Sequence, residues 1–286
     1  MNYRHIYHAG NFADVLKHIV VARIVDYLKR KEKAFRVIDT HAGVGTYDLS
    51  SDEAQKTGEW RAGVGKLEGA ALPGDVAELL SPWLDVVRSL NAGNAVRRYP
   101  GSPALIRHLL RKQDRLTAIE LHPKDAALLQ GLFAGDYQVR VIELDGWLAL
   151  NAQVPPKEKR GLVLVDPPFE EPGDFNRLID GLIKAHRRWP GGTYALWYPI
   201  KDRRTVETYR TALRKCAIPR ILDVSVKIRA PSSELRLDGC GMTLVNPPHV
   251  FEAEAHIWLP FVGAALSEDG VNRAELRRLA GEPKHA

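Results

Sequence analysis

Apolar positions along the chain predict one long helix followed by a series of short strands. Between residues 12 and 31, apolar side chains recur at helical spacing, and Asn11 is a favourable N-cap directly before them. Five short, dense apolar runs come after this helix, each with the length of a strand and each followed by a polar or Gly/Pro-rich turn. They are residues 35–38, 116–119, 139–142, 162–165 and 193–197.

Helical segments are predicted between most of these runs, for example at residues 125–133 and 175–188. The strands are apolar without strict alternation, which is typical of a largely parallel sheet buried on both faces. The sequence therefore predicts an α/β fold with helices on both faces of the sheet. Two later runs, 221–228 and 242–245, are predicted as closing strands that form an antiparallel hairpin at one edge.

The first and second predicted strands are unusually far apart in the chain. Roughly 75 residues separate them, whereas a crossover needs on the order of a dozen or two. Residues 76–89 and 103–111 have helical patterns within this stretch. We therefore expect three parts: an N-terminal segment with the first strand (1–49), a helical insertion (50–100) and the remainder of the main domain (101–286).

The composition excludes several classes of protein. With 286 residues, 45% hydrophobic and 27% charged, the chain is long enough and apolar enough for a large core. Its two cysteines, Cys216 and Cys240, form no C-x-x-C pair, which excludes a disulfide scaffold and a thiolate zinc site and fits a reducing compartment. No apolar run approaches the ~18 residues of a membrane span, and the N-terminus lacks the apolar core of a signal peptide. We expect a soluble, cytoplasmic protein without a metal.

Charge is concentrated at the start of the chain. The net charge is +6, and residues 1–33 contribute four of these charges together with three of the ten histidines. A basic segment indicates an anionic partner, with nucleic acid ahead of a membrane surface, but a solvated helix face is an equally good interpretation of charge alone. The basic residues are Arg4, Lys17, Arg23, Lys29, Arg30, Lys31 and Lys33.

A glycine-rich turn follows the first strand at residues 39–46. Gly43 and Gly45 allow the backbone to approach a ligand closely at the carboxyl end of a parallel strand, where open α/β sheets bind ligands, so we expect Gly43 to contact a cofactor. The turn is no dinucleotide fingerprint, because Asp48 stands where a third glycine is needed. No P-loop motif occurs in the chain.

Two further strand ends carry acidic residues. Glu120 ends the second strand, where a carboxylate can accept hydrogen bonds from ribose hydroxyls. Asp145 and Gly146 follow the third strand, where an acidic group can receive an adenine amino group. Each feature alone is more often a turn, but the order of glycine loop, acid and acid-Gly predicts a nucleoside cofactor.

The sequence Asp166-Pro167-Pro168-Phe169 directly after the fourth strand carries the chemistry. Pro167 keeps Asp166 extended, so that its carboxylate and a nearby carbonyl can both accept hydrogen bonds from one exocyclic amino group. Phe169 supplies a flat face for the base. Two acceptors localise the nitrogen lone pair, which can then attack a sulfonium methyl group held in line. The alternative is a strand that simply ends in prolines. We interpret the similar Asn246-Pro-Pro-His as such a strand stop.

The order of these motifs resembles class I S-adenosylmethionine-dependent adenine-N6 methyltransferases, and over nearly the whole chain it resembles the RlmJ family. Where that family usually has a tyrosine after D-P-P, this chain has Phe169, which keeps the ring and lacks the hydroxyl. The motifs that carry the resemblance are YRHIYHAGN (3–11), ADVLKH (13–18), DTHAGVG (39–45), YPGSP (99–103), ELHP (120–123), DPPF (166–169) and YALWYP (194–199).

The resemblance implies a Rossmann-like, mostly parallel seven-stranded sheet and methylation of one adenine N6 in bacterial 23S ribosomal RNA. It implies that Asp166, Pro167 and Phe169 form the catalytic motif. It also implies that the target nucleotide lies near Tyr3, His5 and Lys17. We expect a monomer acting on a single-stranded or loosely structured target. The implied contacts to S-adenosylmethionine are His18, His41, Ser102, Glu120, Asp145, Gly146 and Asp166.

Three alternatives remain open at this point. A DNA adenine-N6 methyltransferase would use the same motif, but no separate DNA-recognition domain is visible in the sequence. A non-catalytic RNA-binding protein could retain the cofactor fold, although it would have no chemical need of an intact D-P-P-F. An NAD-dependent dehydrogenase is disfavoured by the missing third glycine.

Overall fold

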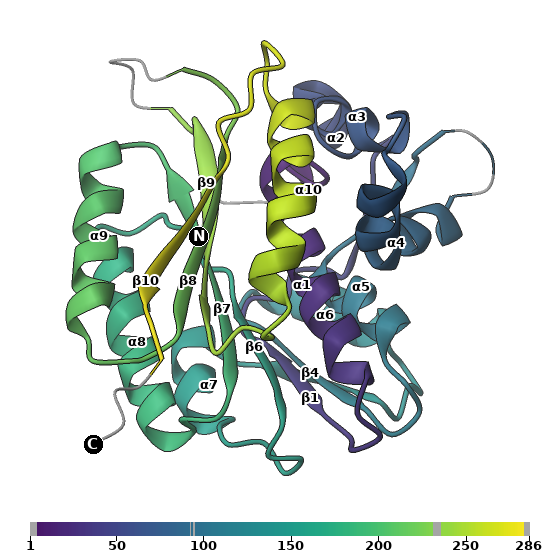
Figure 1. Cartoon of the computed structure of the whole chain (residues 1–286). Coiled ribbons are helices and arrows are strands. Elements are labelled where there is room, and N and C mark those ends of the chain that lie inside the picture. The colour runs from purple at the N-terminus through teal and green to yellow at the C-terminus, as the bar shows by residue number, and fades with distance from the viewer. Residues whose placement is uncertain (1–4, 92, 94, 231–235, 283–286) are drawn as a thin grey trace.

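The computed structural model describes residues 5–91, 93, 95–230 and 236–282, and an eight-stranded sheet forms its centre (Figure 1). The strand order is β10-β8-β9-β7-β6-β1-β4-β5. The strands are β1 (Arg36–Asp39), β4 (Arg115–Glu120), β5 (Val139–Glu143), β6 (Gly161–Val165), β7 (Thr193–Ile200), β8 (Ile221–Lys227), β9 (Gly239–Val245) and β10 (Glu275–Ala280).

Five strands, β5-β4-β1-β6-β7, are parallel, which confirms the predicted α/β class. β9 pairs antiparallel with both β7 and β8, and β8 pairs antiparallel with β10. Two expectations were wrong in detail. The sheet has eight strands instead of seven, and the β8–β9 pair lies inside the sheet because β10 forms the edge.

Helices cover both faces of the sheet (Figure 1). Buried side chains on one face come from helices α1, α4, α5, α6 and α10, and those on the other from α7, α8 and α9. Outside the insertion, the helices are α1 (Phe12–Lys29), α5 (Ser102–Leu109), α6 (Pro123–Leu132), α7 (Gly146–Ala152), α8 (Asp174–Arg188), α9 (Arg203–Lys215) and α10 (Phe251–Leu266). None of the described helices combines the length and the apolarity that crossing a bilayer requires.

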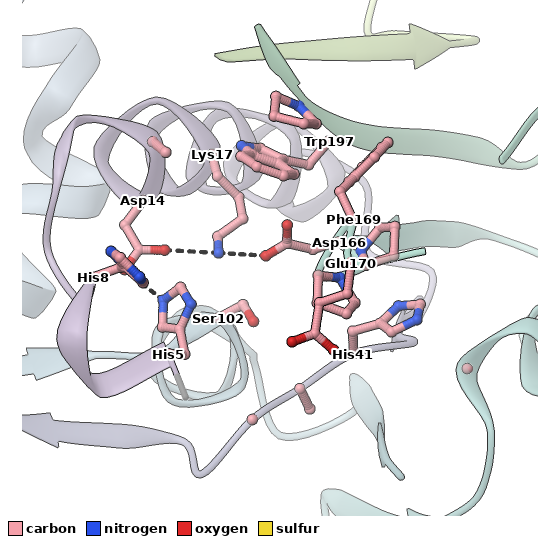
Figure 2. A pocket seen from close by; sticks show the side chains of 18 of the residues that line it. His5, His8, Asp14, Lys17, His41, Ser102, Asp166, Phe169, Glu170 and Trp197 are labelled. Carbon is pink, nitrogen blue, oxygen red and sulfur yellow. Dashed lines mark hydrogen bonds and ion pairs between the residues drawn. The ribbon is translucent and has the colours of Figure 1, made fainter. Parts of the chain in front are cut away.

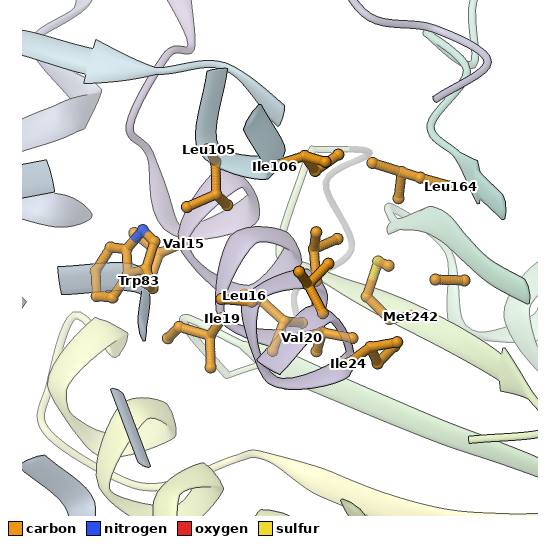
Figure 3. Packing of buried hydrophobic residues seen from close by; sticks show 14 of the residues in the cluster. Val15, Leu16, Ile19, Val20, Ile24, Trp83, Leu105, Ile106, Leu164 and Met242 are labelled. Atoms are coloured by element: carbon orange, nitrogen blue, oxygen red, sulfur yellow. The ribbon is translucent and has the colours of Figure 1, made fainter. Parts of the chain in front are cut away.

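Helix α1 is buried along most of its length, because the sheet, α4, α5 and α10 surround it. It begins where the Asn11 side chain accepts hydrogen bonds from the backbone N–H groups of Ala13 and Asp14. Figure 3 shows its apolar side chains packed between residues of α4, α5, β6 and β9. Those in contact are Val15, Leu16, Ile19, Val20 and Ile24 with Trp83, Leu105, Ile106, Leu164 and Met242.

The long segment after β1 is helical, and a small two-stranded sheet joins its beginning to its end. Strands β2 (Thr46–Asp48) and β3 (Arg98–Pro100) pair antiparallel. Trp83 and Leu80 of this segment belong to the same buried core as α1, so the segment packs on the main domain. The division at residues 49/50 and 100/101 remains a proposal. The intervening elements are α2 (Asp52–Thr57), η2 (Glu59–Arg61), α3 (Val64–Glu68) and α4 (Gly74–Ser89).

The Asn246-Pro-Pro-His segment lies far from the carboxyl ends of the parallel strands. β9 ends at Val245, which pairs with Tyr194 at the start of β7. The Asn246 side chain donates hydrogen bonds to the carbonyl groups of Pro190 and Gly192. The Asn246-Pro-Pro-His segment therefore ends β9 at the amino-terminal end of the parallel strands, as expected of a strand stop.

A buried ion pair joins helix α9 to the antiparallel part of the sheet. The Asp223 carboxylate on β8 is fully buried and accepts hydrogen bonds from Arg210 (Nε, 2.9 Å) and from the hydroxyl groups of Tyr198 (2.9 Å) and Thr243 (3.1 Å). Arg210 also contacts the half-exposed Glu207 at 2.7 Å. The buried cation thus compensates a buried carboxylate on one side and pairs with a half-exposed carboxylate on the other.

We predict that Arg210→Met destabilises the fold by roughly 3–5 kcal/mol, because it leaves the Asp223 carboxylate buried without a cation. Glu207→Gln is the matched control, since it removes the exposed partner of the same arginine and is expected to cost about 1 kcal/mol or less. Urea unfolding of the three proteins measures both values. Equal losses in the two variants would contradict this account of the buried pair.

Candidate active site

One cavity of about 950 Å³ opens at the carboxyl ends of the parallel strands. Every predicted site residue that the structure describes lines it, whereas Tyr3 lies outside the described residues. The residues brought together are His5, Lys17, His18, His41, Gly43, Ser102, Glu120, Asp145, Gly146, Asp166, Pro167 and Phe169.

Asp166 stands at the end of β6 and faces helix α1 (Figure 2). Its Oδ2 accepts a hydrogen bond of 2.5 Å from Nζ of Lys17. Lys17 also forms an ion pair of 2.8 Å with Oδ1 of Asp14, one helical turn earlier. The ammonium group therefore lies between two carboxylates, one from the N-terminal helix and one from the D-P-P-F motif.

The Asp14–Lys17 pair also holds the N-terminal turn. Oδ2 of Asp14 accepts from the backbone N–H of Gly10 and lies 2.9 Å from Nε2 of His5. Burial alone would raise the pKa of Asp14, but His5 and Lys17 hold it well below its usual range. Burial alone would lower the pKa of Lys17, but Asp14 and Asp166 raise it well above its usual range. Both groups stay charged throughout the neutral range.

Four of the basic residues near the N-terminus are paired with carboxylates of the protein, whereas Lys31 and Lys33 are exposed. Besides Lys17, Arg23 pairs with Glu254 at 2.9 Å, and Lys29 pairs with Asp26 at 3.3 Å. Arg30 also contacts Glu254. The expectation that this segment meets an anionic partner stays a prediction, and these four cations are paired with carboxylates within the protein.

Phe169 adopts a left-handed backbone conformation with φ +52°. Its partly exposed ring contacts Phe175 of α8 at a centroid distance of 4.9 Å and Trp197 of β7 at 5.7 Å. This conformation is uncommon for a bulky residue, and such strain concentrates at functional sites. The two aromatic contacts fix the ring at the cavity wall.

The Glu120 carboxylate joins the glycine loop to the turn after β4 by accepting hydrogen bonds from backbone N–H groups. Oε2 of Glu120 accepts from N–H of Gly43, and Oε1 accepts from N–H of His122, both at 2.8 Å. Gly45 has φ +88°, a backbone conformation that favours glycine, and a Cβ there would also come within 2.4 Å of the Leu132 side chain. Each carboxylate oxygen retains acceptor capacity towards the cavity.

Asp145 has a structural task as well as its place in the cavity. Its Oδ1 caps α7 by accepting from the N–H groups of Trp147 and Leu148, which leaves a ligand contact to Oδ2. A Cβ on Gly146 would come within 2.7 Å of the His41 ring, so glycine lets that ring lie close. Burial lowers the pKa of His41 to about 4, and the imidazole is neutral at pH 7.

Two buried polar pairs lie deeper in the cavity. Ser102 donates a 2.7 Å hydrogen bond to Asp39 at the end of β1, and burial raises the pKa of Asp39 to about 7. Nδ1 of His18 lies 2.9 Å from the Tyr99 hydroxyl, and burial lowers the pKa of His18 to about 3. Nε2 of His18 has no hydrogen-bond partner among the described residues. A neutral imidazole with Nδ1 bonded to Tyr99 can offer an Nε2–H donor to a ligand.

Sequence reasoning missed two lining residues that matter to this geometry, Asp14 and Trp197, and also missed the buried Asp39, which accepts the hydrogen bond of Ser102. The spacing of Asp14 and Lys17 (i, i+3) would have indicated a helix-face pair. Asp39 ends a parallel strand as Glu120 does, and the same argument would have selected it. Among the described residues, no cluster of three or more His, Cys, Asp and Glu side chains could hold a metal ion.

Comparisons with known proteins agree with this geometry. The model of the family described as "Ribosomal RNA large subunit methyltransferase D, RlmJ" matches residues 32–277. The chain is 40% identical to the ribosomal RNA large subunit methyltransferase J of Haemophilus influenzae, covering 94% of this chain and 95% of that protein. It is 38% identical to the Escherichia coli protein of the same name, covering 99% and 100%.

A solved structure from Legionella pneumophila has the same fold throughout. Its TM-score is 0.86 at 31% identity, with 95% of this chain and 98% of that chain covered. The family model begins after α1 and extends over the helical segment after β1 and nearly all of the sheet, and the two named relatives cover 94% and 99% of the chain. The chain therefore belongs to the RlmJ family of ribosomal RNA large subunit methyltransferases.

Proposed function

We propose that this protein transfers a methyl group from S-adenosylmethionine to the exocyclic N6 of one adenine in 23S ribosomal RNA. The observation that carries the proposal is the placement of Asp166 and Phe169 at one cavity wall, at the end of β6. An acceptor beside an aromatic ring suits an amino group attached to a flat base. The names of the two bacterial relatives support large-subunit RNA as the substrate.

The cavity fits the proposed cofactor. His18 offers a buried Nε2 that has no hydrogen-bond partner in the described part of the chain, which suits the carboxylate of an amino-acid moiety, and Ser102 lies in the same cavity. Glu120 suits ribose hydroxyls, and Asp145 suits an adenine amino group. Gly43, His41 and Gly146 would complete the contacts. When bound, S-adenosylmethionine supplies an electrophilic sulfonium methyl group.

The chain's own residues would prepare the nitrogen acceptor. Asp166 accepts a hydrogen bond from the target amino group, which orients the nitrogen lone pair and places a carboxylate where the nitrogen must lose a proton. Lys17 fixes the Asp166 carboxylate through Oδ2 and compensates its buried charge. His5 adjoins this pair through Asp14, on the side from which the RNA would approach.

The position of Asp166 also bears on the kind of RNA. Its side chain is only 14% exposed, so an adenine must leave its stack to reach it. We therefore propose a single-stranded or loosely structured target, met in the cytoplasm by a monomeric enzyme. A duplex DNA substrate would have to expel its base in the same way, and a preference for duplex DNA over RNA would favour that alternative.

We expect Asp166→Asn to lower methyl transfer by roughly 10²–10³-fold while the variant still folds, because the amide removes the carboxylate and presents a competing donor. The assay uses tritiated S-adenosylmethionine with deproteinised, unmodified 23S RNA, followed by nucleoside mass spectrometry. N6-methyladenosine should appear with the wild type and fall to near background in the variant. Equal amounts from both proteins, or a different methylated nucleoside, would contradict the proposal.

Lys17 and Glu120 provide a matched pair that separates RNA chemistry from cofactor binding. Lys17→Met should depress methylation by about 10²-fold, which is more than it weakens S-adenosylmethionine binding, and Tm measures the cost of leaving Asp14 and Asp166 without their cation. Glu120→Gln should weaken cofactor binding by roughly tenfold, because a charged acceptor is lost. Calorimetry with the cofactor and steady-state kinetics with the RNA measure the two effects. An equal loss of cofactor affinity in both variants would show that Lys17 has no separate role toward RNA.

A further inference from the structure

Strand β7 presents its side chains alternately to the two faces of the sheet, as the period of a strand requires. Four of its residues, Tyr194, Leu196, Tyr198 and Ile200, belong to the buried core on the α8–α9 face. Trp197 and Pro199 from the other face, and Lys201 directly after the strand, line the cavity. We call these three residues the β7 strip. No role in the methyl transfer proposed above uses them.

Trp197 forms a corner with the aromatic residue of the D-P-P-F motif. Its ring meets Phe169 at a centroid distance of 5.7 Å and an interplanar angle of 67°. In Figure 2 it lies between Lys17 and Phe169, close to the Asp166 carboxylate. A flat base seated against one of these rings is therefore bounded by the other, within reach of the acceptor. The indole is partly exposed and packs against the buried core that contains helix α1.

Lys201 differs from the basic residues of helix α1. It is exposed, it lines the cavity, and the ion pairs found among the described residues do not include it. Lys17 and Arg23, by contrast, are buried and paired with carboxylates. His8, which also lines the cavity, is close enough to Lys201 for the two side chains to interact electrostatically. The His8 ring is hydrogen-bonded to Glu59 at 3.0 Å. An unpaired ammonium at a cavity wall is suited to a phosphate.

We propose that the β7 strip docks the target nucleotide. Trp197 and Phe169 form the two walls around the adenine, and Lys201 binds a phosphate that flanks it. Trp197 and Lys201 are four residues apart, which corresponds to about 13 Å along an extended strand. The flexible lysine side chain can reach from there to a phosphate that flanks the base. The inference rests on the proposed function, because it names the part of the RNA that this strand recognises.

The charge of Lys201 is tested with Lys201→Gln against Lys215→Gln, an exposed lysine at the end of α9 that does not line the cavity. We expect Lys201→Gln to weaken binding of unmodified 23S RNA and to reduce the slope of log K against log salt by about 0.7, the value for one single-strand phosphate. Lys215→Gln should bind as the wild type does. S-adenosylmethionine affinity should be unchanged in both. Identical salt slopes for all three proteins would overturn the phosphate contact.

The base wall is tested with Trp197→Leu and Trp197→Phe. The leucine variant should lose roughly 5- to 100-fold in kcat/KM for the RNA, and phenylalanine should restore most of it, because a flat ring is what the base needs. Cofactor affinity and Tm measure any structural loss. A loss of kcat/KM that phenylalanine does not restore, or that follows the change in Tm in both variants, would contradict the role of Trp197 as a wall for the base.

The two levels of proposal fail differently. If the wild type places no methyl group on 23S RNA adenine N6, the proposed function is wrong. If the wild type methylates the RNA and the β7 strip variants behave like Lys215→Gln, only the docking role is wrong. The lysine comparison stands even if Trp197→Leu does not fold, since Lys201 is exposed.

Discussion

The Lys17 ammonium between Asp14 and Asp166 is the interaction on which the rest of the site depends. Each of these three charges would cost several kcal/mol to bury alone, whereas together they leave one net negative charge that His5 and the Gly10 N–H partly offset. The core fixes Lys17 in turn, because α1 is packed on the sheet, α4, α5 and α10. A carboxylate at a strand end is thereby tied to the most deeply buried helix of the fold.

The helical segment after β1 supports the same arrangement from the other side. The backbone N–H of Val64 donates to the Gly10 carbonyl at 2.9 Å, and a Cβ on Gly63 would lie 2.1 Å from that oxygen. Glu59 accepts from the Asn11 amide at 2.9 Å and also contacts His8. The turn before α1 is thus clamped at both ends, by Asp14 within the helix and by the inserted segment outside it. This gives the long crossover a physical task, which is to hold the N-terminal turn over the cavity.

Much of the fold and part of the site could be predicted from the sequence. Glu120, Asp145 and Asp166 followed from one rule, since carboxyl ends of parallel strands meet at one edge. His18 and Ser102 did not, because a lone histidine on a helix and a serine in a turn carry no spacing signal. β10 was missed because ELRRLA alternates weakly and only pairing with β8 makes it a strand. The place of β9 between β7 and β8 is likewise a matter of long-range pairing, which local apolar patterns do not encode.

The charge distribution shows why a count along the chain misleads about electrostatics. Residues 1–33 hold most of the net positive charge, yet Lys17, Arg23 and Lys29 are each matched by a carboxylate. A paired and buried cation contributes little field at the surface, whereas one exposed ammonium at a cavity wall acts directly on an approaching phosphate. The electrostatic attraction for RNA therefore depends on where cations lack partners, and Lys201 at the end of β7 satisfies that condition where Lys17, Arg23 and Lys29 do not.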